Sequence, residues 1–204
     1  MATQIAAARR AAIAKQALCL RLYAGWGVPM IPEQHALRQL FHQVVSGCYS
    51  EHLGVHDLEV TSYIADLLTE FCVAEKLYPI RDAEGQPIRD VSRMLAAADP
   101  IHGTADSFDD ERRVRKHIGD YALFSTGMFP EGAQRARFSA DAGLLDMVRT
   151  GKESYFIVSQ FNLFEYQSEA AFFGRLAEEF ETYMYGLTKV RGELDRMGAP
   201  VHLM

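Results

Sequence analysis

Residues 107–130 carry the sequence SFDDERRVRKHIGDYALFSTGMFP, and this stretch decides the fold. It begins with a capping-box pattern, in which Ser107 is followed three residues later by Asp110 and side-chain oxygens can satisfy the first backbone N–H groups of a helix. Acidic residues fill the first turn, where the helix dipole favours negative charge. Apolar residues then recur at helical spacing as far as Met128, and Pro130 ends the run. The stretch therefore predicts a helix that begins at Ser107 and ends near Met128.

Helical spacing also extends over most of the chain on either side of this stretch. Residues that interrupt helices, chiefly Gly, Pro and Asp, separate the apolar runs from one another. The expected helices cover roughly residues 4–23, a run that opens near residue 32, a run capped by Asp57, and the segments 90–98, 107–128, 144–161 and 164–197.

One segment departs from the helical pattern. The sequence PIRD at residues 79–82 recurs at residues 87–90, and Gly85 lies between the two copies. Glycine readily adopts the positive φ that a tight hairpin turn requires. We therefore expect a minor two-stranded β ribbon near residues 78–90. The whole chain, residues 1–204, is predicted to be all-α, a single-domain helical bundle of six or seven helices with this ribbon attached.

The composition limits the classes of protein that need to be considered. The chain has 204 residues, of which 49% are hydrophobic and 24% are charged, and its net charge is −6. Such a chain can bury a core and is not typical of a disordered protein. It has no apolar run long enough for a membrane span and no basic block typical of nucleic-acid binding, so we expect neither partner. The three cysteines, Cys19, Cys48 and Cys72, lie far apart and fit a reducing, cytoplasmic compartment.

The beginning of the chain is basic and rich in alanine. No acidic residue precedes Glu33. Alanine is the best helix former, so one interpretation of residues 1–25 is a helix packed against the rest of the protein. A basic arm that docks on an acidic surface and an organellar transit peptide are the alternatives. The basic residues of this segment are Arg9, Arg10, Lys15 and Arg21.

Two stretches resemble a known family. Residues 113–130 contain the pattern H-x-G-D-x-A-L-F-x-x-G-x-F-P, and they precede Tyr155 and the segment FGRLA at residues 173–177. This combination is similar to a family of uncharacterised bacterial proteins of about this size. The resemblance covers mainly the C-terminal half of the chain and implies an all-helical bacterial protein. It implies no activity and no functional residues.

His117 and Asp120 are the candidate catalytic residues. A helix places His117 at the edge of the apolar face and Asp120 about one turn further on, close enough to accept a hydrogen bond from the imidazole. A carboxylate that orients a half-buried histidine suits a general base or a metal ligand. The same pair also suits a core histidine whose polar atoms are satisfied and which has no catalytic role. Both interpretations stay open at this point.

Four further side chains are candidates for ligand binding: Tyr121, Ser125, Tyr155 and Tyr183. Tyrosines have hydroxyl groups that need partners, so these residues could line a semi-polar cleft between helices, around His117. Aromatic residues at helical spacing are more often part of the core. The sequence therefore does not separate a cleft from ordinary packing.

No metal or cofactor is expected. His52 and His56 have a spacing that can bind a metal on one helix face, but Gly54 interrupts them and no third ligand is indicated. His35 and His42 point away from the apolar stripe of their helix and are expected to be solvated. His102 is expected to lie in a surface loop.

The last expected helix carries a narrow apolar seam at spacings of three and four, made of Phe173, Leu176, Phe180, Tyr183, Leu187, Val190 and Leu194. Such a seam is typical of a helix that packs against a partner helix. Gly174, Gly186 and Gly192 weaken a helix there, and we expect close approach by a neighbouring backbone to compensate. We therefore expect a helical binding or assembly protein that forms a homo-oligomer, most simply a homodimer, either through this seam or through the first helix. The alternative is an enzyme or a binding protein for a small-molecule ligand, with a pocket around His117, Asp120 and Tyr155.

Overall fold

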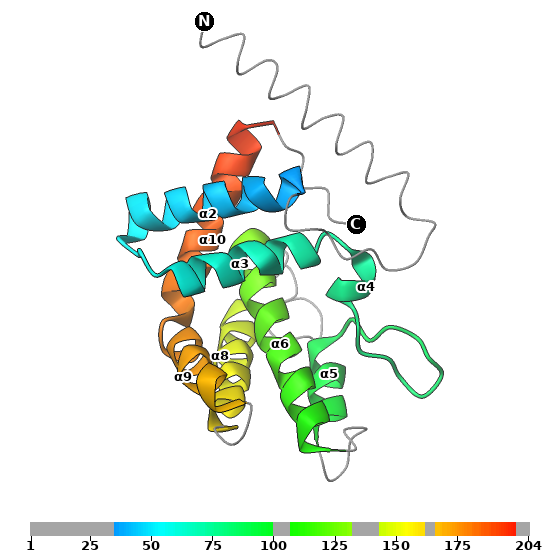
Figure 1. Ribbon diagram of the computed structural model, residues 1–204. Coiled ribbons are helices and arrows are strands. Elements are labelled where there is room, and N and C mark those ends of the chain that lie inside the picture. The colour runs from blue at the N-terminus through cyan, green and yellow to red at the C-terminus, as the bar shows by residue number, and fades with distance from the viewer. Residues whose placement is uncertain (1–34, 100–106, 132–142, 162–165, 199–204) are drawn as a thin grey trace, which may run out of the picture. The chain divides into compact units, whose positions relative to one another are not determined.

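The computed structural model describes residues 35–99, 107–131, 143–161 and 166–198. Within these residues the chain forms eight α-helices, which confirms the all-α class (Figure 1). The expected helix over residues 4–23, the basic segment 1–25 and His102 lie outside the described residues. The helices are α2 (Ala36–Leu53), α3 (Leu58–Glu70), α4 (Ala74–Leu77), α5 (Val91–Ala98), α6 (Phe108–Met128), α8 (Leu144–Gln160), α9 (Gln167–Glu178) and α10 (Phe180–Arg196).

The chain divides into two compact units. Unit 2 comprises Leu77–Thr188, and unit 1 comprises the described residues before Leu77 and after Thr188. The helix α10 therefore contributes its first part to unit 2 and its second part to unit 1. That residues 1–204 behave as a single domain stays a prediction.

In unit 1, α2 packs against α3. His35 caps α2, since its Nδ1 accepts a hydrogen bond of 3.2 Å from the Leu37 N–H, so this helix begins at Ala36 and not near residue 32. His42 is half-buried, and its Nε2 lies 3.1 Å from an Asp66 oxygen on α3. Both histidines are partly exposed, and each also forms a contact that the expectation of a solvated side chain did not include. Asp57 caps α3 as predicted, with its carboxylate accepting from the Glu59 N–H at 2.9 Å.

In unit 2, α6 contacts both α5 and α8, and α8 contacts α9. Figure 1 shows α6 between α5 on one side and α8 and α9 on the other. The predicted start of α6 is confirmed, because the Asp110 N–H donates to Ser107 Oγ at 3.2 Å. The buried side chains that α6 contributes to this packing include Val114, Ile118, Ala122, Leu123 and Met128.

The predicted ribbon is shorter than expected. Only one antiparallel bridge forms, between Arg81 and Pro87, although the Ile88 N–H also donates to the Ile80 carbonyl at 2.9 Å. Gly85 has φ +76° in the turn, as predicted. On the turn side of the bridge, the Asp82 N–H donates to the Gln86 carbonyl at 2.9 Å, whereas the Gln86 N–H donates to the Asp82 side chain at 2.8 Å and adds no backbone bond to the ladder. The hairpin still contributes Ile80 and Ile88 to a buried cluster with α5 and α6.

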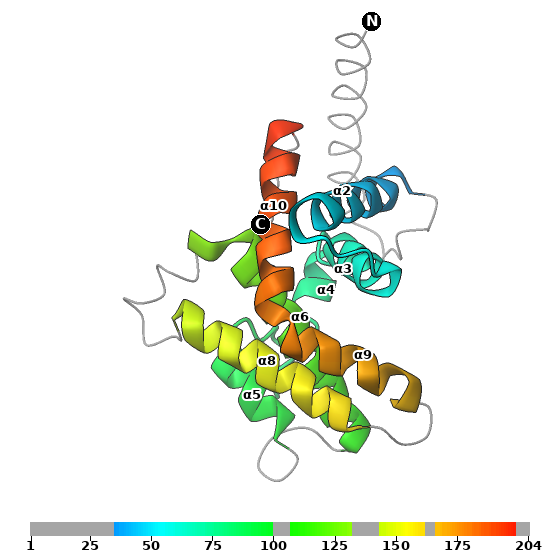
Figure 2. The ribbon, with the colours of Figure 1, turned by 90° about the vertical axis from the view of Figure 1, so that its left-hand side faces the viewer.

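The expected continuous helix over residues 164–197 is divided in two. Glu179, with φ −98° and ψ 22°, separates α9 from α10, and the chain changes direction at this point (Figure 2). All seven seam residues are buried within the chain itself. The seam is therefore used for internal packing, and it no longer supports the expectation of a partner helix along it.

Two of the three seam glycines, Gly174 and Gly192, do not make the close approach that the sequence predicts. A Cβ at Gly174 would come no closer than 3.9 Å to its neighbours, and a Cβ at Gly192 would meet nothing within 4 Å. The tight positions are Gly119, Gly127 and Gly151, where a Cβ would lie 2.5–2.6 Å from a side chain of another helix. Close approach is therefore concentrated where α6 meets α8 and where both meet α10.

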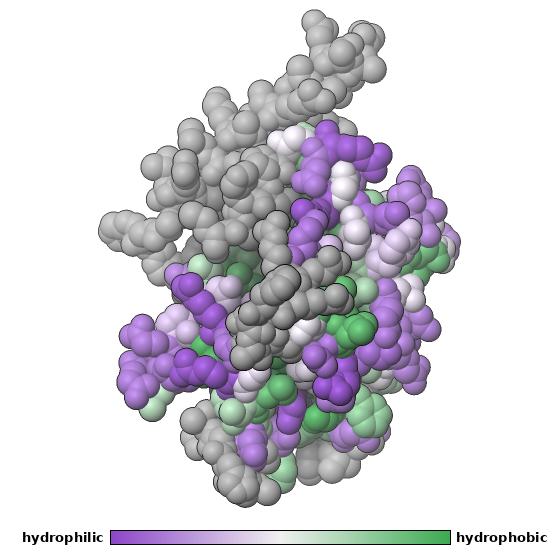
Figure 3. Space-filling view, turned by 180° about the vertical axis from the view of Figure 1, so that it is seen from behind, coloured by the Kyte–Doolittle hydropathy of each residue, from purple (hydrophilic) through white to green (hydrophobic). Residues whose placement is uncertain are grey.

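No helix within the described ranges is both long enough and apolar enough to span a bilayer. The face in Figure 3 carries its hydrophobic residues in small groups among hydrophilic ones.

Candidate functional site

The candidate residues come from three helices of unit 2. His117, Asp120, Tyr121 and Ser125 lie on α6, Tyr155 lies on α8, and Tyr183 lies on α10. The helix α6 is buried along most of its length, so its candidates sit among packed side chains. Tyr183 is buried as one of the seam residues of α10.

Asp120 and Tyr155 form a direct contact. The Tyr155 hydroxyl donates a hydrogen bond of 2.7 Å to Asp120 Oδ1, and Lys116 Nζ lies 2.7 Å from Oδ2 of the same carboxylate. Asp120 is buried, so its negative charge needs compensation within the protein. A charge-assisted hydrogen bond on each oxygen provides that compensation. The contact therefore holds α8 against α6 through two residues 35 positions apart in the chain.

Gly119 makes this contact sterically possible. A Cβ at residue 119 would lie 2.5 Å from Cδ1 of the Tyr155 ring, far inside van der Waals contact. The absence of a side chain lets the ring lie against the α6 backbone, while the adjacent Asp120 receives its hydroxyl. In the Gly-Asp pair of the family-like pattern, Gly119 therefore makes room for the Tyr155 ring and Asp120 accepts its hydrogen bond.

His117 is buried, with 9% of its surface exposed. Burial disfavours the imidazolium ion and lowers the pKa of His117 from 6.5 to about 4, although the charge of Asp120 acts in the opposite direction. Lys116 lowers this pKa further, and a hydrogen bond to the Leu77 backbone raises it. The imidazole is therefore neutral at pH 7. A hydrogen bond between this imidazole and the Asp120 carboxylate, which the helical spacing favours, stays a prediction.

Tyr121 and Ser125 lie on the same side of α6 as His117. The rings of His117 and Tyr121 are 6.4 Å apart, and the Tyr78 ring is 6.0 Å from that of Tyr121. Burial raises the pKa of Tyr121 to about 12, with a smaller contribution from Tyr78, while a hydrogen bond from Ser125 acts in the opposite direction. The structure thus brings His117, Tyr121 and Ser125 into one neighbourhood.

Sequence reasoning missed a row of polar residues beside this site. Arg112 is buried, its Nη2 bonds Glu169 of α9, and its guanidinium carbon lies 3.9 Å from the Tyr166 ring centroid. Lys116 Nζ lies 6.0 Å from the Phe173 ring of α9. The sequence does contain a sign of this row, because Arg112, Lys116 and Asp120 are spaced four residues apart and so share one face of a helix. This row connects the beginning of α6 to α9.

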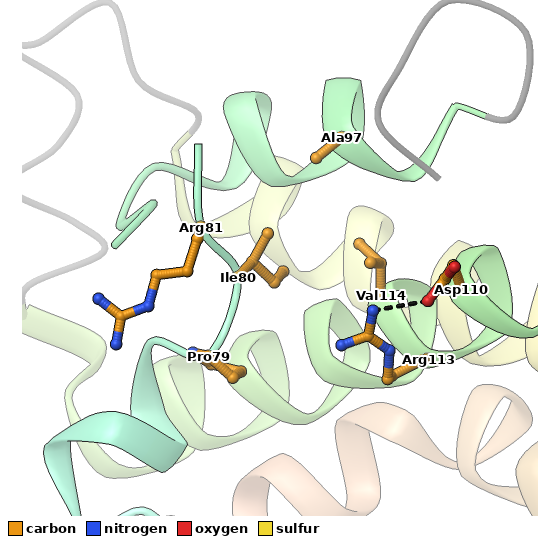
Figure 4. Close-up of a pocket in the computed structure, with 7 residues that line it drawn as sticks. All are labelled: Pro79, Ile80, Arg81, Ala97, Asp110, Arg113 and Val114. Carbon is orange, nitrogen blue, oxygen red and sulfur yellow. Dashed lines mark hydrogen bonds and ion pairs between the residues drawn. The ribbon is translucent and has the colours of Figure 1, made fainter. Parts of the chain in front are cut away.

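A pocket of about 300 Å³ lies near the beginning of α6, and His117 is not among its lining residues. Figure 4 shows Arg113 turned toward Asp110, with which it forms a 2.6 Å ion pair, while Arg81 extends away from that pair. Hydrogen bonds from Arg113 and Ser107 hold the pKa of Asp110 below its usual value. The pocket is lined by Pro79, Ile80, Arg81, Ala97, Asp110, Arg113 and Val114.

The arrangement around His117 offers limited chemistry. A general base is most effective when its pKa lies near the working pH, and a pKa of about 4 makes a neutral imidazole weakly basic at pH 7.

The two histidines with metal-ligand spacing, His52 and His56, do not share a helix. His56 Nδ1 lies 3.2 Å from Ser50 Oγ, and Gly54 ends α2 between His52 and His56. In the portion of the chain that the structure describes, no three His, Cys, Asp or Glu side chains gather as a metal site.

The chain matches no protein-family model, no curated protein and no solved structure. The resemblance of residues 113–130 to a bacterial family stays a prediction.

Proposed function

We propose that this protein is a non-enzymatic helical binding or assembly protein that acts as a homo-oligomer. The observation that supports this proposal most directly is the contact between Tyr155, Asp120 and Lys116. The polar groups that would serve catalysis are used to hold α6 against α8. A buried carboxylate with both oxygens engaged, beside a neutral buried imidazole, is typical of a structural polar cluster.

The alternative is a small-molecule binding or catalytic site around His117, Asp120 and Tyr155, with Tyr121, Ser125 and Tyr183 nearby. One observation favours it, because strongly lowered or raised pKa values occur more often at functional sites than elsewhere. Both His117 and Tyr121 have such pKa values. Burial is the largest cause of each shift, and burial acts in the same way on core residues. We therefore rank this alternative second.

Light scattering coupled to size-exclusion chromatography, over micromolar concentrations, tests the proposal. We expect a mass that is a multiple of the chain mass of 22.9 kDa. The conservative variant Tyr155→Phe should keep this mass, because Tyr155 is buried and its hydroxyl bonds within the chain. A monomer at every concentration would contradict the assembly proposal, and a small molecule retained in native mass spectrometry would favour the alternative.

A further inference from the structure

The outward face of α8 combines exposed apolar side chains with opposite charges. Leu145 is 76% exposed and Phe156 is 57% exposed, whereas most large apolar residues of unit 2 are buried. Arg149 and Glu153 are exposed between them. At about 100° per residue, these four side chains fall within roughly 80° of one another around the helix. The buried residues of α8, such as Gly151 and Val158, lie on the opposite side.

This face is accessible within unit 2. Figure 2 shows α8 in front of α5, with α9 running beside it. Lys152, at the edge of the face, is engaged by Glu181, whose carboxylate oxygens lie 2.8 and 2.9 Å from Lys152 Nζ. Arg149 bonds Asp146 of the same helix at 3.2 Å but both side chains are exposed, and Glu153 is exposed beside them, so a partner on this face would meet charges of both signs.

The order of these residues along α8 is self-complementary. If a second α8 packs in the antiparallel direction about a two-fold axis near residues 150 and 151, Leu145 meets Phe156 of the second copy. The same register brings Arg149 next to Glu153 of the second copy, and each contact occurs twice, as an isologous interface requires. A parallel pairing would instead place Arg149 beside Arg149 and Glu153 beside Glu153, and these like charges would repel.

We propose that a second copy of this chain docks on the outward face of α8, defined by Leu145, Arg149, Glu153 and Phe156, with the two α8 helices antiparallel. This inference rests on the proposed homo-oligomer and names its interface. The helix α8 has 17 residues and so extends about 25 Å. One helix pair of this length forms a small interface, and small interfaces are typical of transient complexes, so we expect dissociation to be measurable at micromolar concentrations.

Sedimentation velocity across the micromolar range, on the full chain, tests this interface. Phe156→Glu buries a charge at the Leu145 contact and should raise the dissociation constant roughly tenfold or more. Phe108→Glu is the matched control, because Phe108 is a phenylalanine on α6 with 75% exposure. It should leave the dissociation constant unchanged.

Charge reversal provides a second test that does not involve the apolar contacts. Arg149→Glu and Glu153→Arg should each weaken the dimer, because each brings like charges together across the axis. The double variant should restore dimerisation, since it exchanges the two partners of each ion pair. Restoration specifically supports antiparallel pairing through this face.

The outcomes separate this inference from the proposed function. A monomeric wild-type protein overturns both. An oligomer that Phe156→Glu and the charge reversals leave unchanged overturns the α8 interface and keeps the homo-oligomer. Equal weakening by Phe156→Glu and Phe108→Glu, or a double charge variant that stays as weak as the single variants, also overturns the α8 interface.

Discussion

At the scale of single residues, the structure explains why a glycine stands beside an aspartate in the middle of α6. The aspartate was identified from the sequence as a candidate partner of His117, because both lie on one helix and helical spacing is local. Its hydrogen bond to Tyr155 could not be predicted in the same way, since that partner lies 35 residues away on another helix. The role of Gly119 follows only once the Tyr155 ring is placed.

Gly119→Ala should destabilise the protein. The new Cβ would lie 2.5 Å from the Tyr155 ring, so the ring or the helix must move, at a cost of about 1–3 kcal/mol. Urea unfolding measures the loss. Gly174→Ala, on α9, is the matched control, because the new Cβ would meet nothing closer than the Ser159 Cβ of α8 at 3.9 Å, and it should raise the free energy of unfolding by up to about 1 kcal/mol. A Gly119→Ala variant as stable as wild type would show that α6 and α8 do not approach so closely.

His117 should make the stability of the protein depend on pH. The pKa of His117 in the folded state is lowered from 6.5 to about 4, so the unfolded chain binds more protons between these values. The stabilisation is fully present above pH 6.5 and is lost as the pH falls to about 4, a difference of roughly 3 kcal/mol. Denaturant unfolding of wild type and His117→Gln at several pH values measures it.

Comparing wild type with His117→Gln isolates the contribution of the imidazole to the pH dependence of stability, because carboxylates such as Asp110 are present in both proteins. His117→Gln should be less stable than wild type at pH 7, and this gap should narrow toward pH 4. A gap that stays constant with pH would mean that His117 is exposed to solvent in the folded protein. It would also return His117 to consideration as an accessible functional group.

At the scale of helices, local signals were predictable and changes of direction were not. The caps Asp57 and Ser107 and the turn at Gly85 were identified correctly, because a cap or turn depends on residues within a few positions. The division at Glu179 was missed because the apolar spacing of three and four continues through it from Phe173 to Leu194. Periodicity reports which side of a helix is buried, and it does not report that the axis turns.

The contact between α6 and α8 should depend on Tyr155 and Asp120 acting together. Tyr155→Phe removes the hydroxyl that bonds a buried carboxylate and should cost about 1.5–3 kcal/mol. Asp120→Asn should also destabilise, since it removes the charge that Lys116 pairs with. In a double-mutant cycle followed by thermal and urea unfolding, the combined loss should be smaller than the sum by at least about 0.5 kcal/mol. Simple additivity would show that the two side chains do not interact.

At the scale of the whole molecule, composition and periodicity were sufficient for the fold class but not for the division of the chain. Periodicity identified the helices, and the interruptions between them gave no sign that residues before Leu77 would group with residues after Thr188. Such grouping depends on contacts between distant segments. For the same reason the apolar seam that spans α9 and α10 was one of two candidate oligomer interfaces, whereas the structure buries its side chains inside the chain.

The two units should unfold together, as the prediction of a single domain requires. The helix α10 is continuous, with Phe180 and Leu187 buried in unit 2 and Val190 and Leu194 buried in unit 1. If unit 2 unfolds, the first turns of α10 lose their packing, and a helix of the remaining length is marginal in water. Gly119→Ala is a change within unit 2, and native-state hydrogen exchange measured by mass spectrometry reports its effect on each helix. It should reduce the protection of backbone amides from exchange in α3 as much as in α6. Loss of protection in α6 with none in α3 would show that the units unfold separately, and residues 1–204 would then comprise two domains.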